Sequence, residues 1–364
     1  MKIGLVCPYN LFKGGGVQEC VFATQAELAK RGHEVLIITP QPREHRGDYP
    51  DFIRLLGRGN DIKSPFHTTA QVSVTVDMDQ VDALLGREQF DVLHFHEPWV
   101  PLISYQLLTR STARNIATFH AKLPDTVMSR TIERVITPYT KSLLKYFSDF
   151  TAVSDAAASY VRSLTDEPVT IIANGIDLSK YKKQKTKPRA DTIFYIGRLE
   201  KRKGVGFLLK ATAELQKNHP DVRLVIAGDG HDRAKLEQSA RDNKLNVEFL
   251  GRISEEEKLK QLAGARIFCS PARYGESFGI VLLEAMAANV PVIAGDNPGY
   301  SGVMTDTGKI SLVDPADTTE FVRRLELLLY DDYIRSAWQL WAEKTVKQYD
   351  YKKIVDQYEK LYRT

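Results

Sequence analysis

Residues 267–294 have the sequence IFCSPARYGESFGIVLLEAMAANVPVIA. In this stretch, Ile267–Ser270 and 292–294 are short apolar runs typical of buried strands, and 278–288 between them has the pattern of a buried helix. A strand, a helix and a second strand in this order predict two parallel strands joined by a helical crossover. We therefore expect a parallel sheet covered by helices in this part of the chain.

The same alternation continues through the rest of the sequence. We predict further strands at 3–7, 34–39, 92–95, 116–119, 169–173, 192–197, 222–227 and 247–250, and further helices at 17–31, 207–218, 233–243 and 255–263. The alternation restarts after residue 168, which predicts two α/β domains. We place them at 1–170 and 171–348, next to the lysine-rich stretch 174–191. We interpret that stretch as a solvated linker, with a membrane-facing basic patch as the alternative.

Composition and charge narrow the functional classes. The 364 residues are 43% hydrophobic and 26% charged, which is typical of globular proteins and disfavours disorder. The net charge of +4 (50 basic minus 46 acidic residues) is too small to make nucleic acid the expected partner. The cysteines, Cys7, Cys20 and Cys269, have no metal-binding spacing, so we expect a reducing, cytoplasmic compartment. No apolar run is long enough to span a membrane, so we expect any membrane contact to be peripheral.

Two loops at predicted strand ends are suited to bind an anion. The loop 8–16 ends in Gly14-Gly15-Gly16 before a helix, where backbone amides can approach a phosphate; a tight strand-to-helix connection is the alternative. Arg198 follows the strand 192–197, and Lys203 comes five residues later. An arginine and a lysine at a strand end suit a diphosphate, although an exposed basic loop would look the same in sequence.

The segment 275–285 gives the strongest chemical signal. Ser277 is predicted to cap the helix that follows, which would leave the amides of Phe278 and Gly279 able to bind a ligand. Glu276 beside them can accept hydrogen bonds from sugar hydroxyls. Glu284 lies eight residues further, about 12 Å along a helix, and would meet the other end of a bound nucleotide.

Taken together, the motifs resemble a known family. In chain order they are GGV (15–17), HEP (96–98), TFH (118–120), NGID (174–177), GRLEKRKG (197–204), AGDG (227–230) and GESFGIVLLE (275–284). This order is similar to that of the family 4 retaining glycosyltransferases of the GT-B fold, and it covers the whole chain. The resemblance implies an α/β protein with two Rossmann-like domains facing across a cleft. A C-terminal helix, at about 349–364, would cross back to the first domain.

The resemblance also implies roles for individual residues. It assigns catalysis to His120, Arg198, Lys203 and Glu276. It assigns donor binding to Gly15, Gly16, Arg198, Lys203, Gly228, Asp229, Glu255, Lys258, Glu276, Ser277, Phe278, Gly279, Ile280 and Glu284. The acceptor would contact Tyr9, His67, Thr69 and His96. No metal ligand and no cofactor are implied, because the nucleotide sugar is a substrate.

Within the family, the chain resembles the bacterial phosphatidylinositol mannosyltransferases. This similarity implies GDP-mannose as donor, a lipid headgroup or polyol as acceptor, and attachment at the inner face of the plasma membrane. The acceptor region departs from that group: 64–73 lacks its arginines, and Asp77, Asp79 and Asp82 replace basic residues of its membrane helix. A transferase that uses a UDP-sugar (glucose or N-acetylglucosamine) and a soluble acceptor therefore stays open. So does a non-catalytic protein that binds nucleotide sugars. A nicotinamide dehydrogenase is disfavoured, because the chain lacks the G-x-G-x-x-G turn.

Two further motifs look like metal sites. Asp77-Met78-Asp79 matches the Asp-x-Asp pattern of other sugar transferases, but it precedes a helix-like segment, so we interpret it as charge at a helix N-terminus. His94 and His96 alternate along a strand end, and no third histidine or cysteine lies nearby in the sequence. We therefore expect these histidines to pack or to shape the acceptor site rather than to bind zinc.

Overall fold

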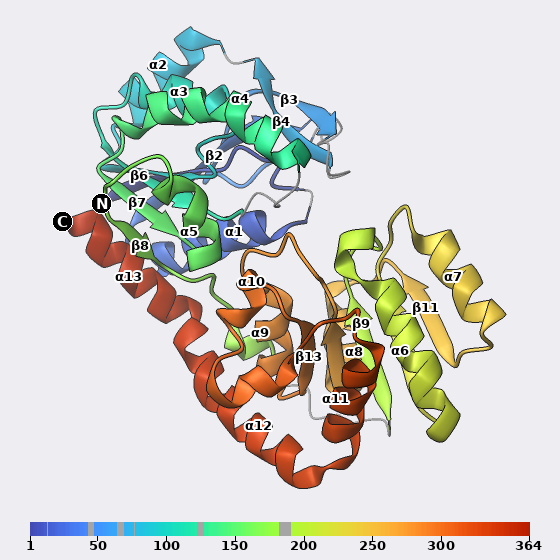
Figure 1. Cartoon of the computed structure of the whole chain (residues 1–364). Helices are drawn as coiled ribbons and strands as arrows, with labels where there is room; N and C mark the ends of the chain where they lie inside the picture. The colour runs from blue at the N-terminus through green and yellow to red at the C-terminus, as the bar shows by residue number, and fades with distance from the viewer. Residues whose placement is uncertain (13, 43–46, 64–68, 76, 122–126, 182–190) are drawn as a thin grey trace. The chain divides into compact units, whose positions relative to one another are not determined.

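The chain divides into two units. The computed structural model describes residues 1–12, 14–42, 47–63, 69–75, 77–121, 127–181 and 191–364, with only the backbone described at 58–63, 69–75, 127–133 and 135 (Figure 1). Unit 1 comprises Met1–Gly175 and Tyr351–Thr364, and unit 2 comprises Ile176–Asp350. The sequence analysis expects these divisions after residue 170 and near residue 349.

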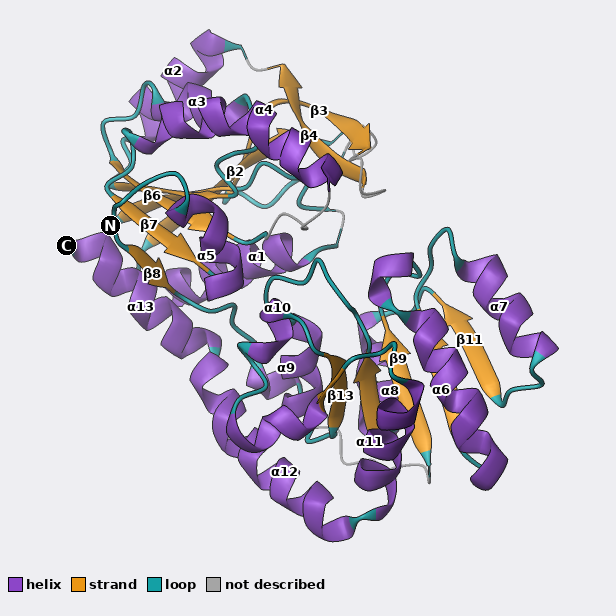
Figure 2. Ribbon diagram, viewed as in Figure 1, coloured by secondary structure: helices purple, strands orange, loops and turns teal. Residues whose placement is uncertain are grey.

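Unit 1 is an eight-stranded sheet with helices on both faces (Figure 2). The strand order is β4-β3-β2-β1-β5-β6-β7-β8, and every neighbouring pair is parallel except β3 and β4. The strands are β1 Lys2–Val6, β2 Glu34–Gln41, β3 Ile53–Lys63, β4 Thr69–Thr75, β5 Val92–His96, β6 Arg114–Phe119, β7 Asp149–Ala152 and β8 Val169–Ile171. The helices are α1 Gly16–Lys30, α2 Met78–Glu88, α3 Ile103–Leu108, α4 Val127–Leu144, α5 Asp155–Arg162 and α13 Tyr351–Arg363.

Strand β1 shows why this sheet is buried on both faces. Ile3 and Leu5 point into the core that α1 and α13 cover. Val6 points into the opposite core, which α2 and α3 cover. Successive side chains of a strand face opposite sides, so a strand with apolar residues at every position needs cover on both.

Helix α13 belongs to unit 1 although it follows unit 2 in the sequence. It packs against α1, where Arg31 bonds Asp356 at 2.7 Å and Glu359 at 2.6 Å. The Tyr362 hydroxyl reaches Nδ1 of His94 in the sheet at 2.7 Å. The prediction that the end of the chain packs on the first domain is thus confirmed for α13. The rest of the helical tail, α12 (Asp332–Thr345), stays in unit 2.

Unit 2 is a six-stranded parallel sheet in the order β11-β10-β9-β12-β13-β14. Its strands are β9 Thr192–Ile196, β10 Arg223–Ala227, β11 Val247–Gly251, β12 Ile267–Ser270, β13 Val292–Gly295 and β14 Leu312–Val313. Its α-helices are α6 Val205–Asn218, α7 Arg233–Asp242, α8 Glu255–Gly264, α9 Ile280–Ala287, α10 Pro298–Ser301, α11 Thr318–Tyr330 and α12. The order is that of a Rossmann fold, with the first and fourth strands, β9 and β12, side by side at the centre.

The α/β class and the parallel sheets are confirmed, and several details differ. Helix α9 begins at Ile280 rather than at residue 278. The antiparallel pair of β3 and β4 and the helices α3 to α5 are not in the prediction, whereas α2 confirms the helix that the sequence indicates after Asp77. Most of the lysine-rich stretch, 182–190, lies outside the described residues. Among the helices of the described residues, none is both long and apolar enough to cross a bilayer.

Candidate functional site

The centre of the unit 2 sheet brings two distant motifs together. Strands β9 and β12 are adjacent, and the chain order reverses between them, which is where open parallel sheets bind ligands beyond their carboxyl ends. Lys203 follows β9 and Glu276 follows β12, and the Lys203 Nζ lies 2.7 Å from the Glu276 Oε1. The structure therefore places both sequence-predicted residues in one site.

Arg202, which the sequence analysis did not select, completes this group. Its Nη1 donates to the same Oε1 of Glu276 at 2.9 Å and to the carbonyl of Gly275 at 3.2 Å. Its Nε reaches Glu200 at 3.1 Å, and Arg198 reaches the other oxygen of Glu200 at 3.0 Å. In sequence, Arg202 is one of several cations in a basic loop, and only its contact with Glu276 marks it out.

The group carries an excess of positive charge. Three cations (Arg198, Arg202, Lys203) face two carboxylates (Glu200, Glu276). Burial lowers the pKa of Arg198, and the charge of Arg202 lowers it further. Burial alone would raise the pKa of Glu276, but Lys203 and Arg202 outweigh it and hold that pKa below its usual range. A bound polyanion would relieve this crowding of cations, so the group is suited to a diphosphate.

Two glycines let the backbone turn close to this group. Gly279 is the N-cap of α9 with φ +102°, and a Cβ there would lie 2.7 Å from the Tyr300 ring. Gly228, after β10, has φ +125°, and a Cβ there would overlap the Gly197 carbonyl. The prediction that Ser277 caps the helix is wrong, because the positive φ of Gly279 delays the helix to Ile280. The amides that open α9 are thus displaced by two residues from the predicted ones.

Lys258 organises the other predicted donor residues. Its Nζ lies 2.7 Å from Glu284 on α9 and 2.8 Å from Glu255 on α8. Burial alone would lower the pKa of Lys258, but the two carboxylates outweigh it and raise that pKa. Glu284 is therefore a buried carboxylate with a cationic partner. Asp229 accepts a hydrogen bond from the Gly230 amide at 2.9 Å, and Phe278 packs edge-to-face on Tyr349 with ring centroids 5.8 Å apart.

In unit 1, the predicted residues also lie at strand ends where the order reverses, between β1 and β5. Gly15 is the N-cap of α1 and Gly16 its first residue, and the Gly15 carbonyl accepts from the Glu19 amide at 3.0 Å. The Tyr9 carbonyl accepts from the Thr39 hydroxyl at 2.9 Å. Burial, with the charge of Glu97, raises the pKa of Tyr9 well above its usual value, so this phenol stays protonated.

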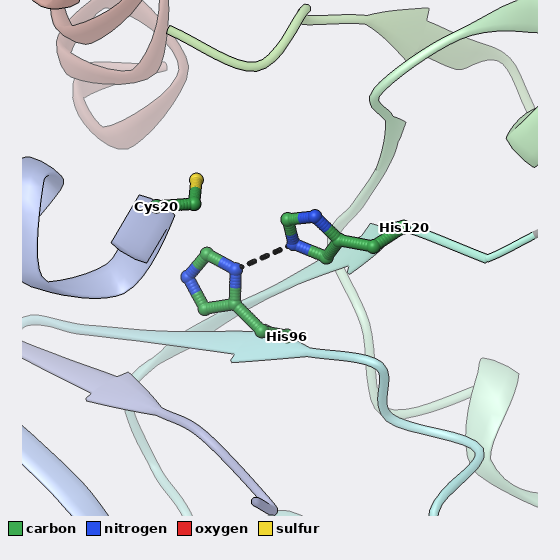
Figure 3. A group of neighbouring side chains, drawn as sticks. All are labelled: Cys20, His96 and His120. Atoms are coloured by element: carbon green, nitrogen blue, oxygen red, sulfur yellow. Dashed lines mark hydrogen bonds between the residues drawn. The ribbon is translucent and has the colours of Figure 1, made fainter. Parts of the chain in front are cut away.

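His96 ends β5, and His120 follows β6 on the neighbouring strand. The two imidazoles are hydrogen-bonded, with 2.8 Å between His96 Nδ1 and His120 Nε2 (Figure 3). Glu97 holds the turn after β6, because its Oε1 accepts from the amides of His120 at 2.5 Å and Ala121 at 2.6 Å. Burial lowers the pKa of His120 to about 4, so this imidazole is neutral at physiological pH.

The remaining predicted positions do not form a common site among the residues that the structure describes. His67 lies outside the described residues, and only the backbone of Thr69, the first residue of β4, is described. Asp77 caps α2 by accepting from the Asp79 amide at 3.1 Å, which confirms the interpretation of this motif as a helix N-terminus. Both ring nitrogens of His94 bond to hydroxyl groups, so His94 offers none to a metal.

Comparisons with known proteins agree along the whole chain. The family description "Glycosyltransferase Family 4" matches residues 14–180, and "Glycosyl transferases group 1" matches residues 178–345. The chain is 30% identical to the phosphatidyl-myo-inositol mannosyltransferase of Mycolicibacterium smegmatis, covering 100% of this chain and 94% of that protein. Over 38% of each chain, it is 38% identical to the GDP-mannose-dependent monoacylated alpha-(1-6)-phosphatidylinositol monomannoside mannosyltransferase of Corynebacterium glutamicum.

Solved structures show the same fold. The Anabaena protein HepE in complex with UDP-glucose is 18% identical and superposes with a TM-score of 0.78 over 100% of both chains. That identity supports the fold alone, whereas the full-length relative at 30% identity shows the family. The chain belongs to family 4 of the glycosyltransferases, enzymes of the GT-B fold that transfer a sugar.

Proposed function

We propose that this enzyme transfers mannose from GDP-mannose to a hydroxyl of a lipid headgroup or polyol, with retention of configuration and without a metal. The single observation that carries the proposal is the joint contact of Arg202 and Lys203 with Glu276 at the centre of the unit 2 sheet. Cations for a diphosphate lie there beside a carboxylate for sugar hydroxyls. The mannosyl donor is supported by the names of the M. smegmatis and C. glutamicum relatives.

The proposed chemistry uses these charges directly. The bond between the anomeric carbon and the donor phosphate breaks, and the nucleoside diphosphate leaves with the electron pair. Arg198, Arg202 and Lys203 would stabilise the negative charge that grows on the leaving diphosphate. The acceptor oxygen attacks the anomeric carbon from the same face, and its proton passes to the leaving phosphate. In this scheme three fixed cations do the work that a metal ion does elsewhere.

At the other end of the donor, the ribose would meet Glu284. Its carboxylate is 7% exposed and is held by Lys258 at 2.7 Å, so its orientation is fixed before the ligand arrives. Such preorganisation reduces the entropy that binding must otherwise cost. Glu255, with the second contact to Lys258, would border the same pocket.

In unit 1, we assign Tyr9 and His96 to the acceptor and place His120 beside the transferred sugar. All are neutral groups, since burial raises the pKa of Tyr9 and lowers those of both histidines. Neutral donors and acceptors suit polyol hydroxyls better than a phosphate. Asp77, Asp79 and Asp82 on α2 would repel an anionic membrane surface there, which favours peripheral contact through other segments.

A panel of nucleotides tests the donor. We would measure the melting temperature and calorimetric affinity with GDP, UDP, ADP, GDP-mannose and UDP-glucose, in buffer with EDTA. Selective stabilisation by GDP and GDP-mannose is expected. Selective stabilisation by UDP and UDP-glucose would replace the mannosyl proposal by the UDP-sugar alternative, which the HepE fold similarity also accommodates.

Radiolabelled transfer then tests the acceptor and the metal. Phosphatidylinositol in vesicles, neutral glycolipid in vesicles and free inositol would be compared with the preferred donor. The variant Arg198→Gln should lose turnover, and Arg241→Gln, on the last turn of α7, should keep it. Transfer that EDTA abolishes would contradict the metal-independent mechanism.

A further inference from the structure

We propose that Cys20, His96 and His120 form a binding site for Zn²⁺ in unit 1. The three side chains come from α1, from the end of β5 and from the turn after β6 (Figure 3). One potential ligand atom from each lies within 4.8 Å of the other two. For His94 and His96, no third histidine or cysteine lies nearby in the sequence. Cys20 is far away along the chain, and only the packing of α1 on the sheet brings it close to His96.

The atoms need only small movements to enclose a metal ion. Tetrahedral zinc with Zn–N of about 2.0 Å and Zn–S of about 2.3 Å places two nitrogens about 3.3 Å apart, and sulfur about 3.5 Å from each nitrogen. The two histidine nitrogens that now share a hydrogen bond are 2.8 Å apart. The imidazoles must therefore open by about half an ångström while the sulfur moves inward, which side-chain rotation can supply.

Neighbouring side chains hold the three ligands in place, and a metal ion can reach them from one side. His94 packs on His96 with ring centroids 4.3 Å apart and ring planes tilted by 31°, and both nitrogens of His94 are bonded to Tyr362 and Thr118. Glu97 fixes the backbone amide of His120. The His120 ring is 8% exposed, against 1% for Cys20, so an ion would enter past His120.

The ligand set selects the kind of metal. One sulfur and two imidazole nitrogens suit Zn²⁺ and Co²⁺, whereas Mg²⁺ and Ca²⁺ take oxygen ligands. Binding would release the thiol proton of Cys20 and leave a fourth position for water. If His120 acts beside the transferred sugar, as the proposed function assigns, an ion held there would inhibit transfer.

Cobalt titration of the purified full chain tests the site. After treatment with a chelator, one equivalent of Co²⁺ is expected to give a thiolate-to-cobalt charge-transfer band and the intense visible bands of tetrahedral cobalt. Addition of Zn²⁺ should abolish both, and excess Mg²⁺ should not. The titration needs no sugar donor, so its failure is distinguishable from failure of the proposed reaction.

Variants locate the ligands. Cys20→Ser should lose the charge-transfer band, and His96→Asn should weaken binding at least 10-fold. Cys269→Ser, a buried free cysteine of unit 2, is the matched control and should behave as the wild type. Circular dichroism would establish that each variant is folded. A wild type without the band, a band that survives in Cys20→Ser, or displacement of Co²⁺ by Mg²⁺ would overturn the proposal.

Discussion

Glu276 shares one carboxylate oxygen between two cations, and this predicts an unusual response to Glu276→Gln. Oε1 lies 2.7 Å from Lys203 and 2.9 Å from Arg202, and the side chain is 12% exposed. A diphosphate that binds these cations must compete with Glu276. The amide of glutamine keeps the size of the side chain but removes its charge, so we expect GDP alone to bind more tightly while sugar transfer is lost.

The contacts of Glu276 determine how large the changes in GDP affinity and in turnover should be. A hydrogen bond to a charged group contributes about 1.5–3 kcal/mol. In the wild type, the diphosphate must displace part of one such bond to Glu276. Without that competition, GDP binding to the variant should be stronger by about 1 kcal/mol, which is about a fivefold lower Kd. Loss of a group that stabilises the transition state typically costs about 10²- to 10³-fold in turnover. Binding and turnover should therefore move in opposite directions.

Calorimetry with GDP and a single-turnover assay with the preferred donor measure the two effects. Glu214→Gln is the matched control, because its carboxylate is 53% exposed and pairs with Lys217 on α6, outside the candidate site. Glu276→Ala should also lose transfer and stay folded. Weaker GDP binding by Glu276→Gln, together with undiminished turnover, would refute this assignment of Glu276.

Three further predictions concern stability and are read from urea or thermal unfolding. Burial alone would raise the pKa of Glu88, but its bonds to three cations lower that pKa to about 2. It therefore contributes about 3 kcal/mol above pH 4.5, which is lost as the pH falls toward 2. Glu88→Gln should destabilise the protein at pH 7 and not near pH 2; equal losses at both would contradict this. Gly279→Ala should lower the free energy of unfolding of unit 2 by about 1–3 kcal/mol, because the residue has a φ of +102° and its new Cβ would collide with the Tyr300 ring. An unchanged melting temperature would contradict this prediction. Tyr362→Phe should cost unit 1 about 1–3 kcal/mol by leaving a buried nitrogen of His94 unpaired; the idea fails if only the unit 2 transition shifts.

The sequence predicts the parallel strands of the core well, because a strand that is buried on both faces needs an apolar residue at nearly every position. Runs such as residues 3–7 and 222–227 are apolar at nearly every position, as expected of strands that are covered on both faces. The pair β3 and β4 escaped prediction for the opposite reason. Strand β3 (IRLLGRGNDIK) contains glycine, asparagine and aspartate, which are depleted in strands, and tertiary pairing with β4 overrides that preference.

For the candidate site, local sequence identified residues but not their partners. Ser277 looks like a helix cap, yet the backbone conformation of Gly279 decides where α9 begins. Arg202 and Cys20 are ordinary residues in their own segments. Each gains significance only from a side chain more than 70 positions away, Glu276 for one and His96 for the other. Contacts of that kind are set by strand order, which composition and periodicity do not encode.

The membership of α13 in unit 1 has a consequence for biosynthesis. Residues 176–350, which form unit 2, are synthesised before the Ile354, Val355 and Tyr358 side chains that close the core of unit 1. The sheet of unit 1 therefore waits for all of unit 2 to be synthesised, and until then the part of its apolar face that α13 covers stays exposed. Unit 1, which is begun first, thus cannot be completed until residues 351–364 have been made, and apolar surface exposed in that interval is prone to aggregation.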